Sequence, residues 1–185
     1  MPDSPSIKTL RARLVPLDAG TARAIATGQR GADWAPDFPA DGDVVVAGLF
    51  ARSPGAPAWP DADPAEAPWR QPWLVRHEDR VVGTVGFKGA PDQGRVEVGY
   101  GLVPSVRGRG LATEAVRGLI MAAAGRGVTE VVAETLTGNR ASQRVLEKLG
   151  FARTGRYTSE EGELITWRLP VTAASGTAPS GDHER

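Results

Sequence analysis

The chain of 185 residues is 41% hydrophobic and 24% charged, which are ordinary values for a globular protein and exclude disorder throughout. Its 22 basic and 22 acidic residues balance, so no long-range field draws the whole protein to nucleic acid or to an anionic membrane. The sequence has no cysteine and only two histidines, which excludes disulfides, thiolate nucleophiles and histidine-rich metal sites.

The length predicts one domain over residues 1–170, followed by a disordered tail, 171–185, that is rich in small and polar residues. No apolar run is long enough to span a bilayer, and the first residues lack the pattern of a signal peptide. We therefore expect a cytoplasmic protein with no membrane partner, and no bound metal.

The first elements are a strand and a helix. Residues 7–17 alternate apolar and basic side chains, which predicts a half-buried strand. Asp18 is predicted to cap a helix over Thr21–Gln29, which Gly28 or Gly31 ends. The apolar stripe of this helix is Ala22, Ile25 and Ala26.

From Trp34 to Pro72 the composition changes to alanine, proline, aspartate and tryptophan, which predicts an irregular or short-helical segment on the acceptor side. Its large aromatic residues are Trp34, Phe38, Trp59 and Trp69, with Trp73 just beyond. Two interpretations remain open for them. They plug the edge of the core, which we favour, or they line an acceptor pocket.

Three strands follow as an antiparallel meander: Trp73–Arg76, Val81–Lys88 and Arg95–Val103, joined by polar turns. Gly99 and Gly101 in the third strand suit a bulge, which would splay it from a neighbour and expose backbone groups.

The run Val106-Arg107-Gly108-Arg109-Gly110-Leu111-Ala112 joins this strand to a helix. Its glycines let the backbone approach a bulky anion, the helix adds the positive end of its dipole, and the arginines add charge. The run therefore predicts a phosphate cradle, although such a sequence also occurs in simple turns.

The rest of the chain alternates helices and strands. A helix from Ala112 is closed by residues 125–127, and Val128–Leu136 is a strand. Asn139–Leu149 is a helix with Ala141, Val145 and Leu149 on one face, Gly150 ends it, and Glu163–Leu169 is the last strand. The order predicts an α/β (α+β) fold, a mixed sheet with helices on its faces.

The motifs of residues 95–151 resemble those of the GNAT superfamily of N-acetyltransferases. Arg107, Gly110 and Ala112 fill the superfamily's pyrophosphate motif. Gly-Tyr-Gly-Leu-Val-Pro at 99–104, Asn139-Arg-Ala-Ser142 and Leu146-Glu-Lys-Leu-Gly-Phe151 lie in the family's order. The nearest branch contains the bacterial ribosomal-protein N-terminal (alanine) acetyltransferases.

The resemblance implies a mostly antiparallel sheet with flanking helices and a splayed strand pair that binds coenzyme A. The cofactor-binding residues that it implies are Leu102, Val103, Arg107, Gly108, Arg109, Gly110, Leu111, Ala112, Thr113, Asn139 and Ser142.

The implied catalytic residues are Glu97, Asn139 and Ser142. Glu97 would take the proton of the attacking amine, or it is only a cross-strand partner of a base such as Arg95. Asn139 and Ser142 would contact the pantetheine and the leaving sulfur, although Asn139 is also a good helix cap.

Many members carry a tyrosine seven residues after this asparagine, and here that position is Leu146. Ser142 or water must then protonate the thiolate, unless it leaves unassisted. Tyr100 and Tyr157 are weaker alternatives, and Glu134 is a second candidate carboxylate.

The sequence thus predicts an N-acetyltransferase that uses acetyl-CoA as cosubstrate and transfers acetyl to a primary amine by direct attack in a ternary complex. The amine belongs to a protein N-terminus or a small molecule, chosen by residues 34–72 and around Tyr157. A non-catalytic acyl-CoA sensor is the main alternative, and a nucleotide-binding domain is a distant third. We expect a monomer or homodimer.

Overall fold

The computed structural model describes residues 6–52, 67–124 and 126–171. Its strands are β1 (Ile7–Lys8), β2 (Arg13–Pro16), β3 (Trp73–His77), β4 (Arg80–Phe87), β5 (Arg95–Leu102), β6 (Glu130–Leu136), β7 (Ala152–Ser159) and β8 (Gly162–Pro170). Its helices are α1 (Ala19–Ala26), α2 (Asp41–Arg52), α3 (Ala67–Arg70), α4 (Leu111–Ala124) and α5 (Arg140–Leu149), with a short 3-10 turn at Pro104–Val106. In these parts of the chain, no helix has the length and apolar character needed to cross a membrane.

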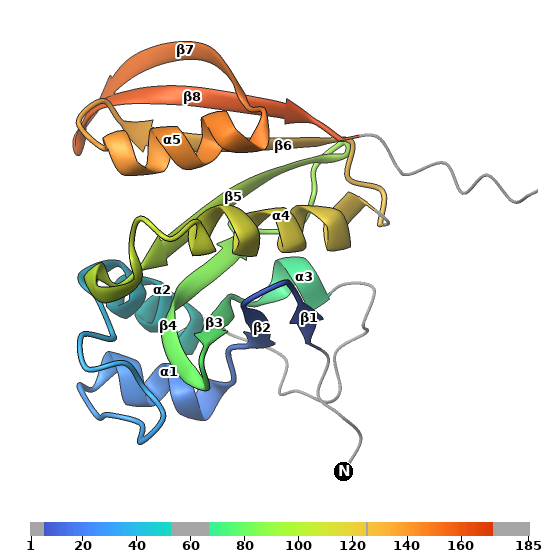
Figure 1. The fold of residues 1–185 in the computed structure, drawn as a ribbon. Helices are drawn as coiled ribbons and strands as arrows, with labels where there is room; N and C mark the ends of the chain where they lie inside the picture. Colours follow the sequence, from blue (N-terminus) through green and yellow to red (C-terminus); the bar gives the residue numbers. More distant parts are fainter. Residues whose placement is uncertain (1–5, 53–66, 125, 172–185) are drawn as a thin grey trace, which may run out of the picture.

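The strands form one eight-stranded sheet in the order β1-β2-β3-β4-β5-β6-β8-β7. All neighbours are antiparallel except β5 and β6, which α4 connects. Figure 1 shows β6 to β8 with α5 at one end of the molecule, β1 to β3 with α1 to α3 at the other, and β5 with α4 between them. The predicted mixed, mostly antiparallel α/β fold is confirmed.

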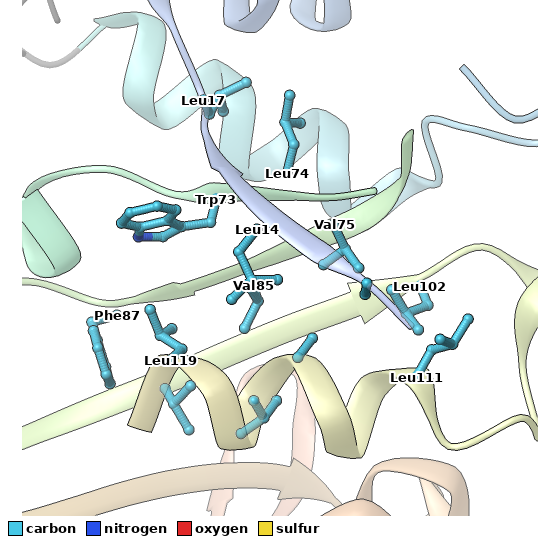
Figure 2. Close-up of a cluster of buried hydrophobic side chains, with 14 of the residues drawn as sticks. Leu14, Leu17, Trp73, Leu74, Val75, Val85, Phe87, Leu102, Leu111 and Leu119 are labelled. Atoms are coloured by element: carbon cyan, nitrogen blue, oxygen red, sulfur yellow. The ribbon is translucent and has the colours of Figure 1, made fainter. Parts of the chain in front are cut away.

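One part of the core lies between α4 and the sheet. Leu111 and Leu119 of α4 are fully buried, and Figure 2 shows them facing the strands that carry Val85 and Leu102. Apolar residues recur along α4 at helical spacing, so one face of this helix is buried while Arg117 and Met121 stay exposed. The packing fixes the start of α4 against the end of β5.

The centre of the sheet is split. β5 and β6 pair only from Arg95↔Glu130 to Glu97↔Val132, and beyond that point each continues with its outer neighbour alone. The predicted bulge at Gly99 and Gly101 is wrong, because the β4–β5 register runs without a shift there. Figure 1 shows β5 and β6 diverging from the end where they pair, and we call this opening the splay.

The predicted strand over residues 7–17 is instead two strands. A tight turn separates β1 from β2, with the Thr9 amide donating to the Ala12 carbonyl at 2.9 Å. Leu10 sits in this turn and is 89% exposed, contrary to its expected burial. Asp18 caps α1 as predicted, accepting from the Thr21 amide at 2.9 Å, but the helix begins and ends earlier than expected, and Ala26 is exposed.

The tryptophan-rich segment contains a longer helix than expected. α2 has 12 residues because residues 40–53 hold no proline. Trp34, Phe38, Trp69 and Trp73 are buried in the core, which confirms the core-plug interpretation for them, whereas Trp59 lies outside the described residues. The tail prediction for 171–185 likewise falls outside them beyond Val171.

Two expectations near the C-terminus are wrong. Strand β7 was not predicted, because it is an edge strand whose residues are almost all exposed, so no apolar alternation marks it. The core face of α5 is formed by Gln143 and Leu146, rather than by Ala141 and Val145. Gln143 is buried because its amide donates to the carbonyls of Leu136 and Thr137, so a polar residue occupies a core position.

Candidate active site

The glycine run is a loop of exposed backbone donors at the start of α4. Gly108 and Gly110 have φ values of 78° and 80°, which residues other than glycine rarely adopt. In the part of the chain that the structure describes, the amides of residues 108–113 have no acceptor, and the first intrachain bond is from the Glu114 amide to the Gly110 carbonyl at 3.0 Å. These amides and the helix dipole favour an anion.

The opposite side of this loop is held by the β1–β2 turn. The Arg11 guanidinium donates to the Arg109 carbonyl at 2.9 Å and to a Glu114 carboxylate oxygen at 3.0 Å. The Thr9 hydroxyl donates to the other Glu114 oxygen at 2.6 Å. Burial alone would raise the pKa of Glu114, but the bonds from Thr9 and Arg11 outweigh it and lower the pKa. These contacts between the β1–β2 turn and the loop before α4 were not predicted from the sequence.

A cavity of about 390 Å³ opens in front of the amides. Its charged lining residues are Arg107, Arg144 and Lys148, with no carboxylate among the lining residues. The Thr113 hydroxyl is buried in the first turn of α4, and it has no hydrogen-bond partner among the residues that the structure describes. A cationic cavity with free amides and an orphaned hydroxyl fits a polyphosphate ligand, so the residues fit the expected coenzyme.

Most of the predicted cofactor residues line this cavity: Leu102, Arg107, Gly108, Gly110, Leu111, Ala112, Thr113, Asn139 and Ser142. Val103 is fully buried in the core, and Arg109 does not line the cavity. The other lining residues, which were not predicted to bind the cofactor, are Tyr100, Gly101, Val106, Ala141, Arg144, Val145 and Lys148. Arg144 and Lys148 lie four residues apart on α5, and this helical spacing was a signal that could have found them.

The start of α5 borders the same cavity. The Asn139 side chain accepts from the Ser142 amide at 3.1 Å, so it caps the helix as predicted. The Tyr100 hydroxyl donates to the Ser142 carbonyl at 3.1 Å, and burial raises the pKa of Tyr100 to about 12. Tyr100 therefore stays protonated at neutral pH. Leu146 is fully buried, so its side chain packs in the core.

A second cavity, of about 260 Å³, lies on the other side of Tyr100, Asn139 and Ser142, which line both. Its charged lining residues are Lys88, Glu134 and Glu161. Because the two cavities have these three residues in common, a group held in one is adjacent to a group held in the other. We call the boundary formed by Tyr100, Asn139 and Ser142 the junction.

A third cavity, of about 350 Å³, is lined by Glu97 together with Glu134. Glu97 forms an ion pair with Lys88, not with Arg95, whose guanidinium pairs with Glu130 at 2.6 Å. The lining residues of the second and third cavities include none from 34–52 or 67–72. Within the described residues, no cluster of three or more His, Cys, Asp or Glu could hold a metal ion.

Tyr157 lies beside these carboxylates. Its hydroxyl donates to Glu134 Oε1 at 2.9 Å. This bond, together with the charges of Glu134, Glu97 and Glu161, raises the pKa of Tyr157. The phenol thus remains a hydrogen-bond donor at neutral pH.

The split mixed sheet and the loop before α4 define an acetyltransferase-like domain. The acetyltransferase (GNAT) domain family matches residues 11–152, and the chain belongs to this family, as its motifs predicted. An uncharacterised N-acetyltransferase of Bacillus subtilis, YjdG, is 39% identical over 83 residues, covering 43% of this chain and 49% of the relative. The chain spans about half the length of the curated relatives that it matches.

Solved structures have the same fold. A GNAT-family acetyltransferase from Bacillus anthracis has a TM-score of 0.63 at 17% identity, over 90% of this chain and 98% of that one. RimJ of Mycobacterium smegmatis, in complex with CoA-disulfide, has a TM-score of 0.63 at 18% identity, over 91% and 88%. The ribosomal-protein-S5-alanine acetyltransferase of Vibrio fischeri has 0.62 at 16%, over 90% and 97%.

Proposed function

We propose that the protein is an acetyl-CoA-dependent N-acetyltransferase that acetylates a primary amine in a ternary complex. The observation that carries this proposal is the junction. There a cationic cavity with free amides meets a second cavity whose charged lining residues are two carboxylates, Glu134 and Glu161, and Lys88. The named relatives and the structural neighbours that contain coenzyme A support the choice of cosubstrate.

The residues of the first cavity would hold the diphosphate and pantetheine. The amides of residues 108–113 and the Thr113 hydroxyl would bind phosphate oxygens, while Arg107, Arg144 and Lys148 would balance the charge. The backbone that β5 and β6 expose where they diverge could pair with an amide-containing arm, as an added strand would. When bound, acetyl-CoA supplies an activated acetyl thioester.

The second and third cavities would hold the amine. Most primary amines are protonated at neutral pH, so a carboxylate there must accept a proton before the nitrogen can attack. Glu97 and Glu134 are the candidates on the two diverging strands. Ser142 borders both cavities and can donate a proton from its hydroxyl to a leaving thiolate.

The test is a thiol-release assay with acetyl-CoA against a panel of N-terminal peptides and small amines. We expect amine-dependent release of the thiol and an acetylated product by mass spectrometry. Gly110→Glu serves as the control, because a side chain at a φ of 80° strains the loop of amides and its carboxylate adds negative charge to that loop, so both CoA binding and thiol release should be abolished.

Coenzyme A binding by calorimetry without acetylation of any amine would contradict the proposal and favour the acyl-CoA sensor. The panel also separates a peptide acceptor from a small-molecule acceptor. A cytoplasmic location and a monomeric or homodimeric state stay predictions from the sequence.

A further inference from the structure

Each of the two diverging strands carries a carboxylate near the point where they separate. Glu97 of β5 is paired with Val132, the last ladder position that the two strands have in common. Glu134 lies two residues further along β6, inside the opened part, and pairs on its other side with Thr166 of β8. The two carboxylates therefore differ in their distance from the closed end of the splay.

Glu97 already has a cationic partner. Lys88, just after β4, forms an ion pair with Glu97 Oε1, and the Glu97 side chain is 28% exposed. Glu97 lines the third cavity, whose lining residues include neither Asn139 nor Ser142. To accept a proton at the junction, Glu97 would have to leave Lys88 and reach past the third cavity.

Glu134 lines both the second and the third cavity. In the second cavity it faces the junction residues Tyr100, Asn139 and Ser142. Among the described residues, Glu134 has no ion-pair partner, so its charge is not already balanced by an arginine or lysine. It thus borders the cavity in which an amine would approach Ser142.

Tyr157 orients this carboxylate. Its hydroxyl occupies Glu134 Oε1, which leaves Oε2 to accept from another donor. Glu161 is the other carboxylate of the second cavity, but it lies in the β7–β8 turn, and its side chain accepts no hydrogen bond from the described residues. The charged groups that line the two cavities around Glu134 are Lys88, Arg95, Glu97, Glu161 and Arg168.

Resting on the proposed function, we propose that Glu134 is the carboxylate that accepts the proton of the acceptor amine, and that Tyr157 is its positioning residue. The ammonium nitrogen donates to Glu134 Oε2 and transfers one proton to it. The products are a neutral amine, with its lone pair free, and a carboxylic acid. Because Glu134 is exposed, it then returns the proton to water.

The first test is the pH dependence of kcat for four variants. Glu134→Gln should lower kcat by about 100-fold or more and remove the acid limb of the profile, whereas Glu134→Asp should keep the limb at a reduced rate. Tyr157→Phe should lower kcat while leaving the KM for the amine nearly unchanged, because the carboxylate is no longer held in one orientation. Glu97→Gln should keep the acid limb. Calorimetry with CoA checks that each variant retains the cofactor cavity.

The second test needs no activity. The chain has only two tyrosines, so the ultraviolet absorbance of tyrosinate reports Tyr100 and Tyr157 alone, and Tyr157→Phe assigns the two transitions. Glu134→Gln should lower the pKa of Tyr157, since Glu134 is the main cause of its rise. Glu160→Gln, at an exposed position in the β7–β8 turn that lines none of the three cavities, should leave both transitions unchanged.

An acid limb retained in Glu134→Gln but lost in Glu97→Gln would overturn the proposal and return the role to Glu97. An unchanged Tyr157 transition in Glu134→Gln would remove the positioning role of Tyr157. A wild-type protein that acetylates no amine would contradict the proposed function and this assignment together. Activity in the wild type with a wild-type profile in Glu134→Gln would contradict the assignment alone.

Discussion

Thr113 keeps a buried hydroxyl without a hydrogen-bond partner in the first turn of α4, where it lines the cationic cavity. A buried polar group without a partner costs about 1–3 kcal/mol. The free amides of the same turn have no acceptor either in the described residues. The hydroxyl and the amides together fit one anionic ligand, so this turn contributes to binding at some cost in stability.

Replacing Thr113 with valine should therefore move affinity and stability in opposite directions. We expect the Kd for CoA to rise about 5–20-fold, because a hydrogen bond to a charged ligand is lost. Tm should stay the same or increase, because valine removes the unpaired hydroxyl. Calorimetry and thermal unfolding measure the two effects.

The matched control is Thr84→Val. The Thr84 hydroxyl is also buried, but it donates to Asp43 at 2.7 Å and lies outside the cavity. This variant should lower Tm and leave CoA affinity within about twofold. Unchanged CoA affinity in Thr113→Val would remove Thr113 from the ligand contacts.

Among the elements, the sequence predicted those with regular apolar spacing. α4 and the strands β3 to β6 appear within a few residues of their expected bounds, because each buries one periodic face or a continuous run. The loop before α4 was predictable because glycines next to an expected helix start allow the positive φ values found there. Strand β7 was not, since neither sheet face of this edge strand is buried.

The candidate site was predictable only in part, for a related reason. Local motifs identify groups on one segment, such as the amides before α4, but Tyr157 and Glu134 meet only through the pairing of β6, β8 and β7. The ion pair between Glu97 and Lys88 likewise depends on the β4–β5 register. Such long-range pairings leave no local pattern in a single sequence.

Helix α5 offers a prediction at this scale. Arg144 and Lys148 lie on its exposed side, one turn apart, and both line the cationic cavity. The double variant Arg144→Ala/Lys148→Ala should raise the Kd for CoA about 10-fold at low salt, and the difference should shrink at high salt as screening increases. Calorimetry at two ionic strengths measures this effect.

Arg117→Ala is the control for that pair, because Arg117 is exposed on α4 and lines none of the three cavities. It should change neither the affinity nor its salt dependence. Equal losses in Arg117→Ala and the double variant would mean that net charge, rather than the position of the cations, governs binding.

In the whole molecule, the two halves of the sheet are joined where β5 and β6 pair, and one side chain links three strands there. Glu130 of β6 binds Arg95 of β5 at 2.6 Å and also contacts Arg168 of β8. Its side chain is 13% exposed. This link lies at the closed end of the splay, so it holds the halves together without occupying the opened part where the cavities lie.

Burial alone would raise the pKa of Glu130, but the bonds from Arg95 and Arg168 outweigh it and lower the pKa below its ordinary value of 4.5. The stabilisation is therefore fully present above that value and is lost as the pH falls through the lowered pKa. Glu130→Gln should lower Tm at pH 7 by about 2–4 °C, which corresponds to about 1 kcal/mol, and the difference from the wild type should shrink in acid. Thermal unfolding at pH 7 and in acid checks both.

Glu147→Gln is the control. It breaks a pair with Arg153 in which both side chains are about half exposed, and it should change Tm little at either pH. If Glu147→Gln and Glu130→Gln lower Tm equally, the link across the three strands has no special role in joining the halves.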